Sequence, residues 1–233
     1  MNDSGPSFFQ KHLFFMVHVK GMLTHGFAKK HYGQWAEDVA LTHIFGKQQS
    51  GFYIDVGAFH PKHYSNTYLL YKRGWHGINI DPNYASIALF RWYRPRDINL
   101  MMGIGQDEGK KTYYEFNHQS CNTFSREQME HMRTKKFVRY LGERNVPCMP
   151  LKNVIAEYAA GKTVDLLNID VEGLGLDVLR SIDWELTTIR VICVEDDAFD
   201  SVNPQRSEIY TFLRDHGYTL SQKVGLSCIY MQK

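Results

Sequence analysis

Short apolar runs alternate with amphipathic segments along most of the chain. Residues 33–45 place apolar side chains at helical spacing, and the run that follows, GFYIDVG (51–57), begins as a continuous apolar stretch and stops at Asp55. The same pattern predicts strands at 51–57, 77–81, 98–105, 164–170 and 188–196, and helices at 33–45, 64–75, 84–94, 153–161, 175–184 and 207–217. Apolar strands that alternate with helices are typical of a mostly parallel sheet buried on both faces.

Two parts of the chain depart from this alternation. Residues 218–233 read as two antiparallel strands that close the sheet. The part between the third and fourth predicted strands is less regular, with extended stretches at 112–116 and 146–151 and a polar helix or mobile segment at 126–143. We therefore predict one doubly wound α/β domain over 49–233, preceded by an N-terminal helical extension over 1–48.

The amino-acid composition is sufficient for a large hydrophobic core, and it restricts the classes of partner that the protein could bind. Hydrophobic residues make up 43% of the 233 residues, and 27 Lys and Arg nearly balance 25 Asp and Glu, which argues against a nucleic-acid partner. The four cysteines form no CxxC pair and indicate free thiols, and the apolar stretch Leu13–Val17 is too short for a transmembrane segment. We expect a cytoplasmic protein, and the sequence leaves its oligomeric state open, a homo-oligomer included.

Four predicted strands end in a carboxylate. Asp55, Asp81, Asp170 and Glu195 each follow an apolar run. In an open parallel sheet, ligands bind at the carboxyl ends of the strands, so these acids should meet at one rim. Each alone has a simpler explanation, because a strand often finishes in a polar residue as it reaches solvent.

The turn after the first strand indicates what the rim binds. It reads D-x-G-A and lacks the first and third glycines of the dinucleotide fingerprint G-x-G-x-x-G. Gly57 allows close approach to the main chain, Asp55 favours a cation, and Asp81 is placed to accept bonds from ribose hydroxyls. A nucleoside with a positive centre and no phosphate describes S-adenosylmethionine.

These segments resemble the FkbM family of S-adenosylmethionine-dependent methyltransferases. The resemblance covers about residues 33–233 and rests on IDVGA, SNT and INIDPN in the first half, CNTFS at 121–125, and VDLLNIDVEGLGLDVLRS and ICVE in the second half. It implies a Rossmann-like class I methyltransferase fold with a seven-stranded sheet of order 3-2-1-4-5-7-6. The family's turn often reads DVGAN, whereas this chain continues with Phe59, His60 and Pro61.

The resemblance also implies which residues contact the cofactor. They lie at the ends of the first three predicted strands and at the start of the first crossover helix: Asp55, Gly57, Ala58, Asn66, Thr67, Asp81, Gly103 and Ile104. Asn66 and Thr67 would lie at the methionine end, Asp81 at the ribose, and Gly103 and Ile104 at the adenine.

Methyl transfer to a hydroxyl requires a base or a metal ion to take the proton. Asp170 and Glu172 share one side of an extended segment, and with Glu195 they could hold Mg²⁺ or another divalent cation. Alternatively, Asp170, His60 or His63 is the base. Simpler explanations are that Asp170 contacts the cofactor's amino group, that Glu172 caps a helix and that both histidines are surface residues.

Relatives in this family commonly methylate hydroxyls, often on sugars of glycans, lipopolysaccharides or secondary metabolites. We therefore expect O-methylation of a small-molecule or glycan acceptor. The alternatives are N-methylation of an amine or protein and a noncatalytic binding module that keeps the fold. Residues 118–145, with their aromatic and basic side chains, would form a lid or acceptor surface, or a solvated insertion.

Overall fold

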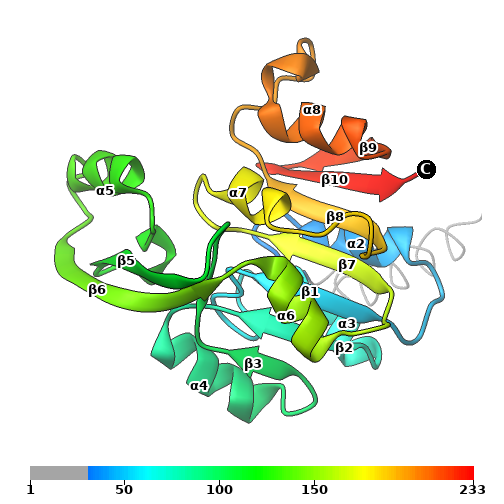
Figure 1. Cartoon of the computed structure of the whole chain (residues 1–233), viewed down its shortest axis with the longest axis horizontal. Helices are drawn as coiled ribbons and strands as arrows, with labels where there is room; N and C mark the ends of the chain where they lie inside the picture. The colour runs from blue at the N-terminus through cyan, green and yellow to red at the C-terminus, as the bar shows by residue number, and fades with distance from the viewer. Residues whose placement is uncertain (1–30) are drawn as a thin grey trace, which may run out of the picture. The chain divides into compact units, whose positions relative to one another are not determined.

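A seven-stranded sheet organises the chain in the computed structural model, which describes residues 31–233 (Figure 1). Its strands are β1 (Phe52–Val56), β2 (His76–Ile80), β3 (Ile98–Leu100), β7 (Val164–Ile169), β8 (Ile189–Glu195), β9 (Tyr218–Val224) and β10 (Ser227–Gln232), in the order β3-β2-β1-β7-β8-β10-β9. The first five are parallel, and β10 pairs antiparallel with β8 and β9. The mostly parallel sheet with an antiparallel edge is therefore as predicted.

The chain also contains a smaller sheet that the sequence did not reveal. It consists of β4 (Gly103–Ile104), β5 (Gly109–Phe116) and β6 (Tyr140–Met149), in the order β4-β6-β5. With these strands included in the numbering, the main sheet reads 3-2-1-7-8-10-9; only when its own seven strands are counted does the predicted order 3-2-1-4-5-7-6 result. The predicted strand 98–105 is divided between the two sheets.

The smaller sheet and the segment between its strands form an arm. The helix α5 (Arg126–Arg133) and the short η1 (Gln119–Cys121) connect β5 to β6, so the polar helix predicted for 126–143 ends early and its last residues are strand. Figure 1 shows the arm extending from the side at which the parallel strands end. Arg144 of β6 anchors it there, because its Nη2 donates to the Pro82 carbonyl, 2.7 Å away and just after β2.

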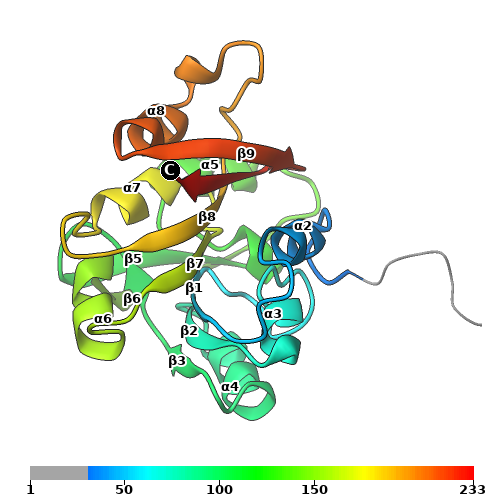
Figure 2. The same ribbon diagram turned by 90° about the vertical axis from the view of Figure 1, so that its right-hand side faces the viewer.

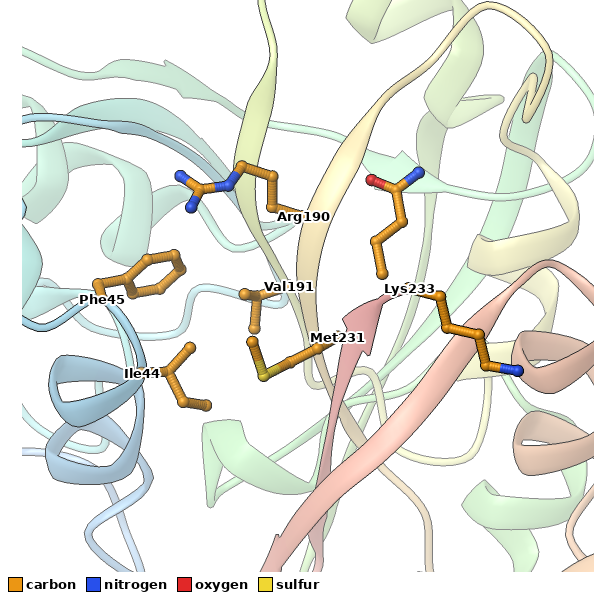
Figure 3. A pocket seen from close by; sticks show the side chains of 7 residues that line it. Ile44, Phe45, Arg190, Val191, Met231 and Lys233 are labelled. Atoms are coloured by element: carbon orange, nitrogen blue, oxygen red, sulfur yellow. The ribbon is translucent and has the colours of Figure 1, made fainter.

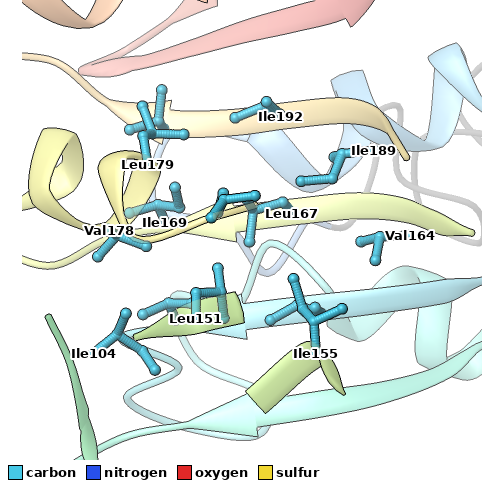
Figure 4. Packing of buried hydrophobic residues seen from close by; sticks show 14 of the residues in the cluster. Ile104, Leu151, Ile155, Val164, Leu167, Ile169, Val178, Leu179, Ile189 and Ile192 are labelled. Carbon is cyan, nitrogen blue, oxygen red and sulfur yellow. The ribbon is translucent and has the colours of Figure 1, made fainter. Parts of the chain in front are cut away.

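Helices cover both faces of the main sheet. On one face, α6 (Leu151–Tyr158), α7 (Gly175–Arg180) and α8 (Glu208–Asp215) contribute to the larger apolar cluster with Ile54 and Leu167 (Figure 4). On the other face, α2 (Glu37–Ile44) and α3 (Tyr68–Arg73) pack against Tyr53 and Leu166 (Figure 2). Along the chain, α4 (Tyr84–Tyr93) lies between β2 and β3, and the short η2 (Pro204–Arg206) lies between β8 and α8. Because strand side chains alternate between faces, β1 supplies both cores.

Residues Tyr32–Lys233 form one compact unit. The part of the predicted N-terminal extension that is described contains α2, whose Leu41 is fully buried in the same apolar cluster as Tyr53. The predicted helical character of the earlier apolar stretch falls within 1–30, outside the described residues, and the predicted boundary at 48 stays a prediction. In the described part of the chain, no helix is both long enough and apolar enough to span a bilayer.

Candidate functional site

One row across the sheet is polar, near the carboxyl ends of the parallel strands. Backbone register aligns Asn99 of β3, Asn79 of β2, Asp55 of β1, Asn168 of β7 and Cys193 of β8. Asp55, Asn79 and Asn168 are all buried. A buried carboxylate is costly unless it is hydrogen-bonded or paired, so this row must contain partners for Asp55.

Side-chain hydrogen bonds supply those partners. Asp55 Oδ2 accepts from the Thr67 hydroxyl at 2.6 Å, and Asp55 Oδ1 accepts from Asn168 Nδ2 at 2.9 Å. Asn66 Nδ2 in turn donates to Asn168 Oδ1 at 3.0 Å. Burial raises the pKa of Asp55, while the Thr67 bond, the Arg94 charge and the Asn168 bond lower it. The structure thus brings Asp55, Asn66 and Thr67, predicted from separate parts of the sequence, into one network.

Gly57 is required for a reason other than the one inferred from the sequence. Its φ is 79°, and a Cβ built on it would lie 1.8 Å from the backbone oxygen of Asp170. The amides of Gly57 and Ala58 both donate to the Ile80 carbonyl, at 2.9 and 3.1 Å. The bare Cα therefore lets the ends of β1 and β7 touch each other, whereas the sequence suggested that it admits a ligand.

Asp81 fastens the loop after β1 to the end of β2. Its Oδ2 accepts from the Phe59 amide at 2.9 Å and its Oδ1 from the Asn83 amide at 2.7 Å. Burial raises the pKa of Asp81 to about 6, against the lowering effect of these two bonds. A carboxylate has about four acceptor positions, so two remain for the hydroxyls of a ribose.

The acids at the ends of β7 and β8 form a cluster. Asp170 is an exposed residue, yet desolvation of its carboxyl raises its pKa well above the usual range, as do repulsion from Glu195, the interaction with the Glu195 side chain and repulsion from Glu172. Burial and Glu195 raise the pKa of Glu172 to about 7. The structure therefore confirms that these three carboxyls meet at one rim. Asp170 and Glu195 lie close enough together for each to shift the pKa of the other.

The metal prediction gains no support from this cluster. Among the described residues, no group of three or more His, Cys, Asp or Glu side chains has an arrangement that could hold a metal ion. Asp170, Glu172 and Glu195 therefore fit proton transfer and positioning better than metal binding.

We expect the cluster to make the fold less stable as pH rises. Because Glu172 has a pKa raised from 4.5 to about 7, its contribution to stability is complete below about 4.5 and is lost as pH rises through about 7. Glu172→Gln should therefore lose less stability than the wild type between pH 4.5 and pH 8, by on the order of 1–2 kcal/mol. Urea unfolding at both pH values measures this, with exposed Glu185→Gln as the matched control. Equal losses in Glu172→Gln and the wild type would contradict the expectation.

His60 and His63 lie next to each other on the loop after β1, with ring centroids 4.8 Å apart. His60 Nδ1 accepts from the backbone amides of Lys62 and His63, each at 3.0 Å. Burial lowers the pKa of His60, and the positive charge of Arg94 lowers it further. One nitrogen of His60 is thus committed to the turn, and a role for either histidine as the base stays a prediction.

Gly103 and Ile104 form the short strand β4, where the predicted adenine contact would lie. A Cβ on Gly103 would meet Phe124 Cζ at 2.5 Å and Cys148 Sγ at 2.7 Å, so that side of Gly103 is filled by the arm. Ile104 belongs to the larger apolar cluster. The structure gives both residues a packing role, and their contact with adenine stays a prediction.

A hollow of about 220 Å³ lies at the other end of the strands (Figure 3). It is lined by Ile44, Phe45, Arg190, Val191, Met231, Gln232 and Lys233. Arg190 stands near the start of β8, and its Nη1 is already paired with Asp165 Oδ1 at 2.6 Å. This hollow is therefore separate from the acidic rim, to which β8 contributes its last residue, Glu195.

Two residues at the rim were not identified from the sequence. Glu37 of α2 is buried, and its charge raises the pKa of both Cys193 and Glu195, which places it beside the acid cluster. Arg94 is fully buried behind the Asp55 network. A carboxylate in the first turn of a helix and an arginine before a proline are both common, so no local signal distinguished them.

The arm also reaches this rim, because Gln128 of α5 lies close enough to Glu172 to lower its pKa. A family model described as "Methyltransferase FkbM domain" matches residues 55–220, a stretch that begins in β1 and ends in β9. It contains Asp81, Arg94 and Asp170, although it begins after Glu37. Among curated proteins, no match is found.

Proposed function

This chain belongs to the FkbM methyltransferase family, and on that premise we propose that it transfers the methyl group of S-adenosylmethionine to a hydroxyl of a sugar or another small molecule. The cofactor assignment rests mainly on a buried side-chain oxygen that accepts no hydrogen bond from the described residues. Asn66 Oδ1 is buried and has no hydrogen-bond partner among the described residues. This acceptor is linked to Asp55 through Asn168 and lies 2.8 Å from the position that a Cβ on Gly33 would take. A buried acceptor of this kind suits the ammonium group of an amino acid.

The remaining residues suit the rest of the cofactor. Asp81 would hold the ribose hydroxyls with its two free acceptor positions. The acids Asp55, Asp170 and Glu195 favour a positive charge at the rim, and the turn at Gly57 has no feature that would hold a phosphate. When bound, S-adenosylmethionine supplies a methyl group activated by its sulfonium.

The acid cluster supports a hydroxyl as the acceptor. A sugar hydroxyl is a weak acid, and a carboxylate with a raised pKa is a better base for it than an ordinary carboxylate. Asp170 is an exposed residue, and it has such a pKa because desolvation of its carboxyl and repulsion from Glu195 disfavour the charged form. In this proposal Asp170 takes the hydroxyl proton, and Glu172 and Glu195 hold and orient the acceptor. Gln128, on the arm, forms a boundary of the part of the rim that would bind the methyl acceptor.

Nucleoside binding tests the cofactor assignment. We expect calorimetry to show binding of 5′-methylthioadenosine that strengthens as pH rises through about 6, since Asp81 loses its proton there. Asp81→Asn should bind it about tenfold more weakly and without this pH dependence. Exposed Asp107→Asn is the control. Absence of binding by the wild type at millimolar S-adenosylmethionine and 5′-methylthioadenosine would refute the proposal.

Transfer of a labelled methyl group tests the acceptor class. A panel of monosaccharides, nucleotide sugars, small amines and peptides would be incubated with labelled S-adenosylmethionine and the protein. Label on sugar oxygen supports the proposal, and label on nitrogen would replace it with the N-methyltransferase alternative. Cofactor binding with no transfer to any class would favour the noncatalytic module.

A further inference from the structure

Arg94 is a fully buried cation at the C-terminal end of α4. Its Nε and Nη2 donate to the Pro61 carbonyl at 2.9 and 2.5 Å, and Nη2 also donates to Ser65 Oγ at 2.7 Å. Nη1 donates to Thr67 Oγ1 at 2.8 Å. All of these acceptors lie between Pro61 and Thr67, the segment that leads into α3. One guanidinium therefore holds the whole segment that carries Asn66.

The chemistry of Arg94 fixes the direction of the next hydrogen bond. A guanidinium can only donate, so the Thr67 oxygen must accept from it. The Thr67 proton is then directed at Asp55 Oδ2, 2.6 Å away. An ionised carboxylate can only accept, so Arg94 at one end and Asp55 at the other impose the same direction on the two hydrogen bonds of Thr67. Arg94 also favours the ionised form of Asp55 by its charge.

The ionised Asp55 also fixes the orientation of the two amides on its other side. Because Asp55 Oδ1 accepts, it is the Nδ2 end of Asn168 that faces it, at 2.9 Å. The Asn168 oxygen must then face Asn66, whose Nδ2 donates to it at 3.0 Å. Asn66 Oδ1 is left pointing away from the network, as an acceptor with no partner among the described residues. An ionised Asp55 thus selects the amide orientation that leaves an acceptor available.

We propose that Arg94 is a positioning residue for the amino-acid end of the cofactor. Through Thr67 and Asp55 it sets the orientation of Asn168 and Asn66, so that the Asn66 oxygen faces the ammonium group of a bound α-amino acid moiety. This inference rests on the proposed function. Arg94 itself touches neither the cofactor nor the acceptor, because it is enclosed by Phe90, Tyr68 and Tyr71, with ring centroids 5.0–5.4 Å from its guanidinium carbon.

A pair of ligands separates this role from a purely structural one. S-adenosylhomocysteine and 5′-methylthioadenosine are both thioethers of the same nucleoside, but only the first has an amino-acid end. A residue that orients Asn66 should affect binding of the first and not of the second. A residue that only supports the fold should affect both equally.

The decisive variant is Thr67→Val, which keeps the shape of the side chain and removes the hydroxyl that connects Arg94 to Asp55. We expect calorimetry to show S-adenosylhomocysteine binding about tenfold weaker and 5′-methylthioadenosine binding within about twofold of the wild type. Thr67→Ser retains the hydroxyl and should bind both ligands normally. Arg94→Lys keeps the charge without the planar fork and should resemble Thr67→Val.

The outcomes are distinct. Selective loss of S-adenosylhomocysteine in Thr67→Val, restored in Thr67→Ser, supports the inference. Unchanged binding in Thr67→Val, or equal loss of both ligands, overturns it and leaves the proposed function standing. A wild type that binds neither ligand overturns the proposed function and this inference with it. If Arg94→Lys does not fold, as judged by circular dichroism, the two Thr67 variants decide.

Discussion

Gly57→Ala should be strongly destabilised and should lose cofactor binding. The alanine would have to occupy the left-handed region at φ 79°, which costs about 1–2 kcal/mol. Its Cβ would also lie 1.8 Å from the Asp170 carbonyl oxygen, so β1 and β7 would have to separate at their carboxyl ends. We expect the free energy of unfolding to fall by about 3 kcal/mol or more, and S-adenosylmethionine affinity to fall at least about tenfold.

Gly161→Ala is the matched control for this experiment. Gly161 has a similar φ of 72°, but nothing lies within 4 Å of the position that its Cβ would take. This variant therefore carries the conformational cost alone, about 1–2 kcal/mol, and should bind the cofactor normally. Urea unfolding and calorimetry on both variants separate the backbone cost from the strand contact. Equal effects of the two substitutions would show that the approach of Gly57 to Asp170 contributes nothing.

Asp170→Asn should abolish most of the activity without weakening the fold. If Asp170 takes the acceptor proton, its amide replacement should lower kcat about 10²–10⁴-fold. Labelled-methyl transfer to the acceptor found in the panel measures this. Asp165→Asn, at the other end of β7, is the activity control.

The stability of Asp170→Asn distinguishes a site residue from a structural one. The pKa of Asp170 is raised in the folded protein, so its favourable contribution is present at low pH and is lost as pH rises through that pKa. The asparagine in Asp170→Asn does not ionise, so the variant does not lose this stability as pH rises. At pH 8 the variant should be at least as stable as the wild type in urea unfolding, a common trade-off at active sites. A large loss of stability with the kcat unchanged would assign Asp170 to the fold.

Local pattern was sufficient for most of the main sheet. The apolar runs at β1, β2, β7 and β8 and the antiparallel pair β9–β10 all form, because periodicity and continuous apolarity are properties of short segments. The arm was harder. Its β6 strand, Tyr140–Met149, alternates exposed residues with partly or fully buried ones along a polar sequence, and its partners β4 and β5 lie on either side of it. Nothing in the sequence of β6 indicates which strands will form hydrogen bonds with its backbone.

The rim shows the same division. Carboxylates at strand ends predicted that Asp55, Asp81, Asp170 and Glu195 would gather, because parallel strands end on one side of a sheet. Glu37 and Arg94 were missed, because both become buried only in the folded chain. The Thr67 hydroxyl that accepts from Arg94, for example, lies 27 residues earlier in the sequence. The metal set was inferred from spacing alone, and spacing does not show whether three carboxyls will be arranged around a common point, which these are not.

The sequence by itself determined the element types, the parallel α/β class and the acids that follow the strands, because these depend on neighbours a few residues apart. Only the tertiary structure decided which polar groups satisfy each other. The hydrogen bond from Asn168 to Asp55 joins residues 113 positions apart, and the bond from Arg94 to Thr67 joins residues 27 apart. Hydrogen bonds act over about 3 Å, so such partners are known only once the folded chain has brought them together.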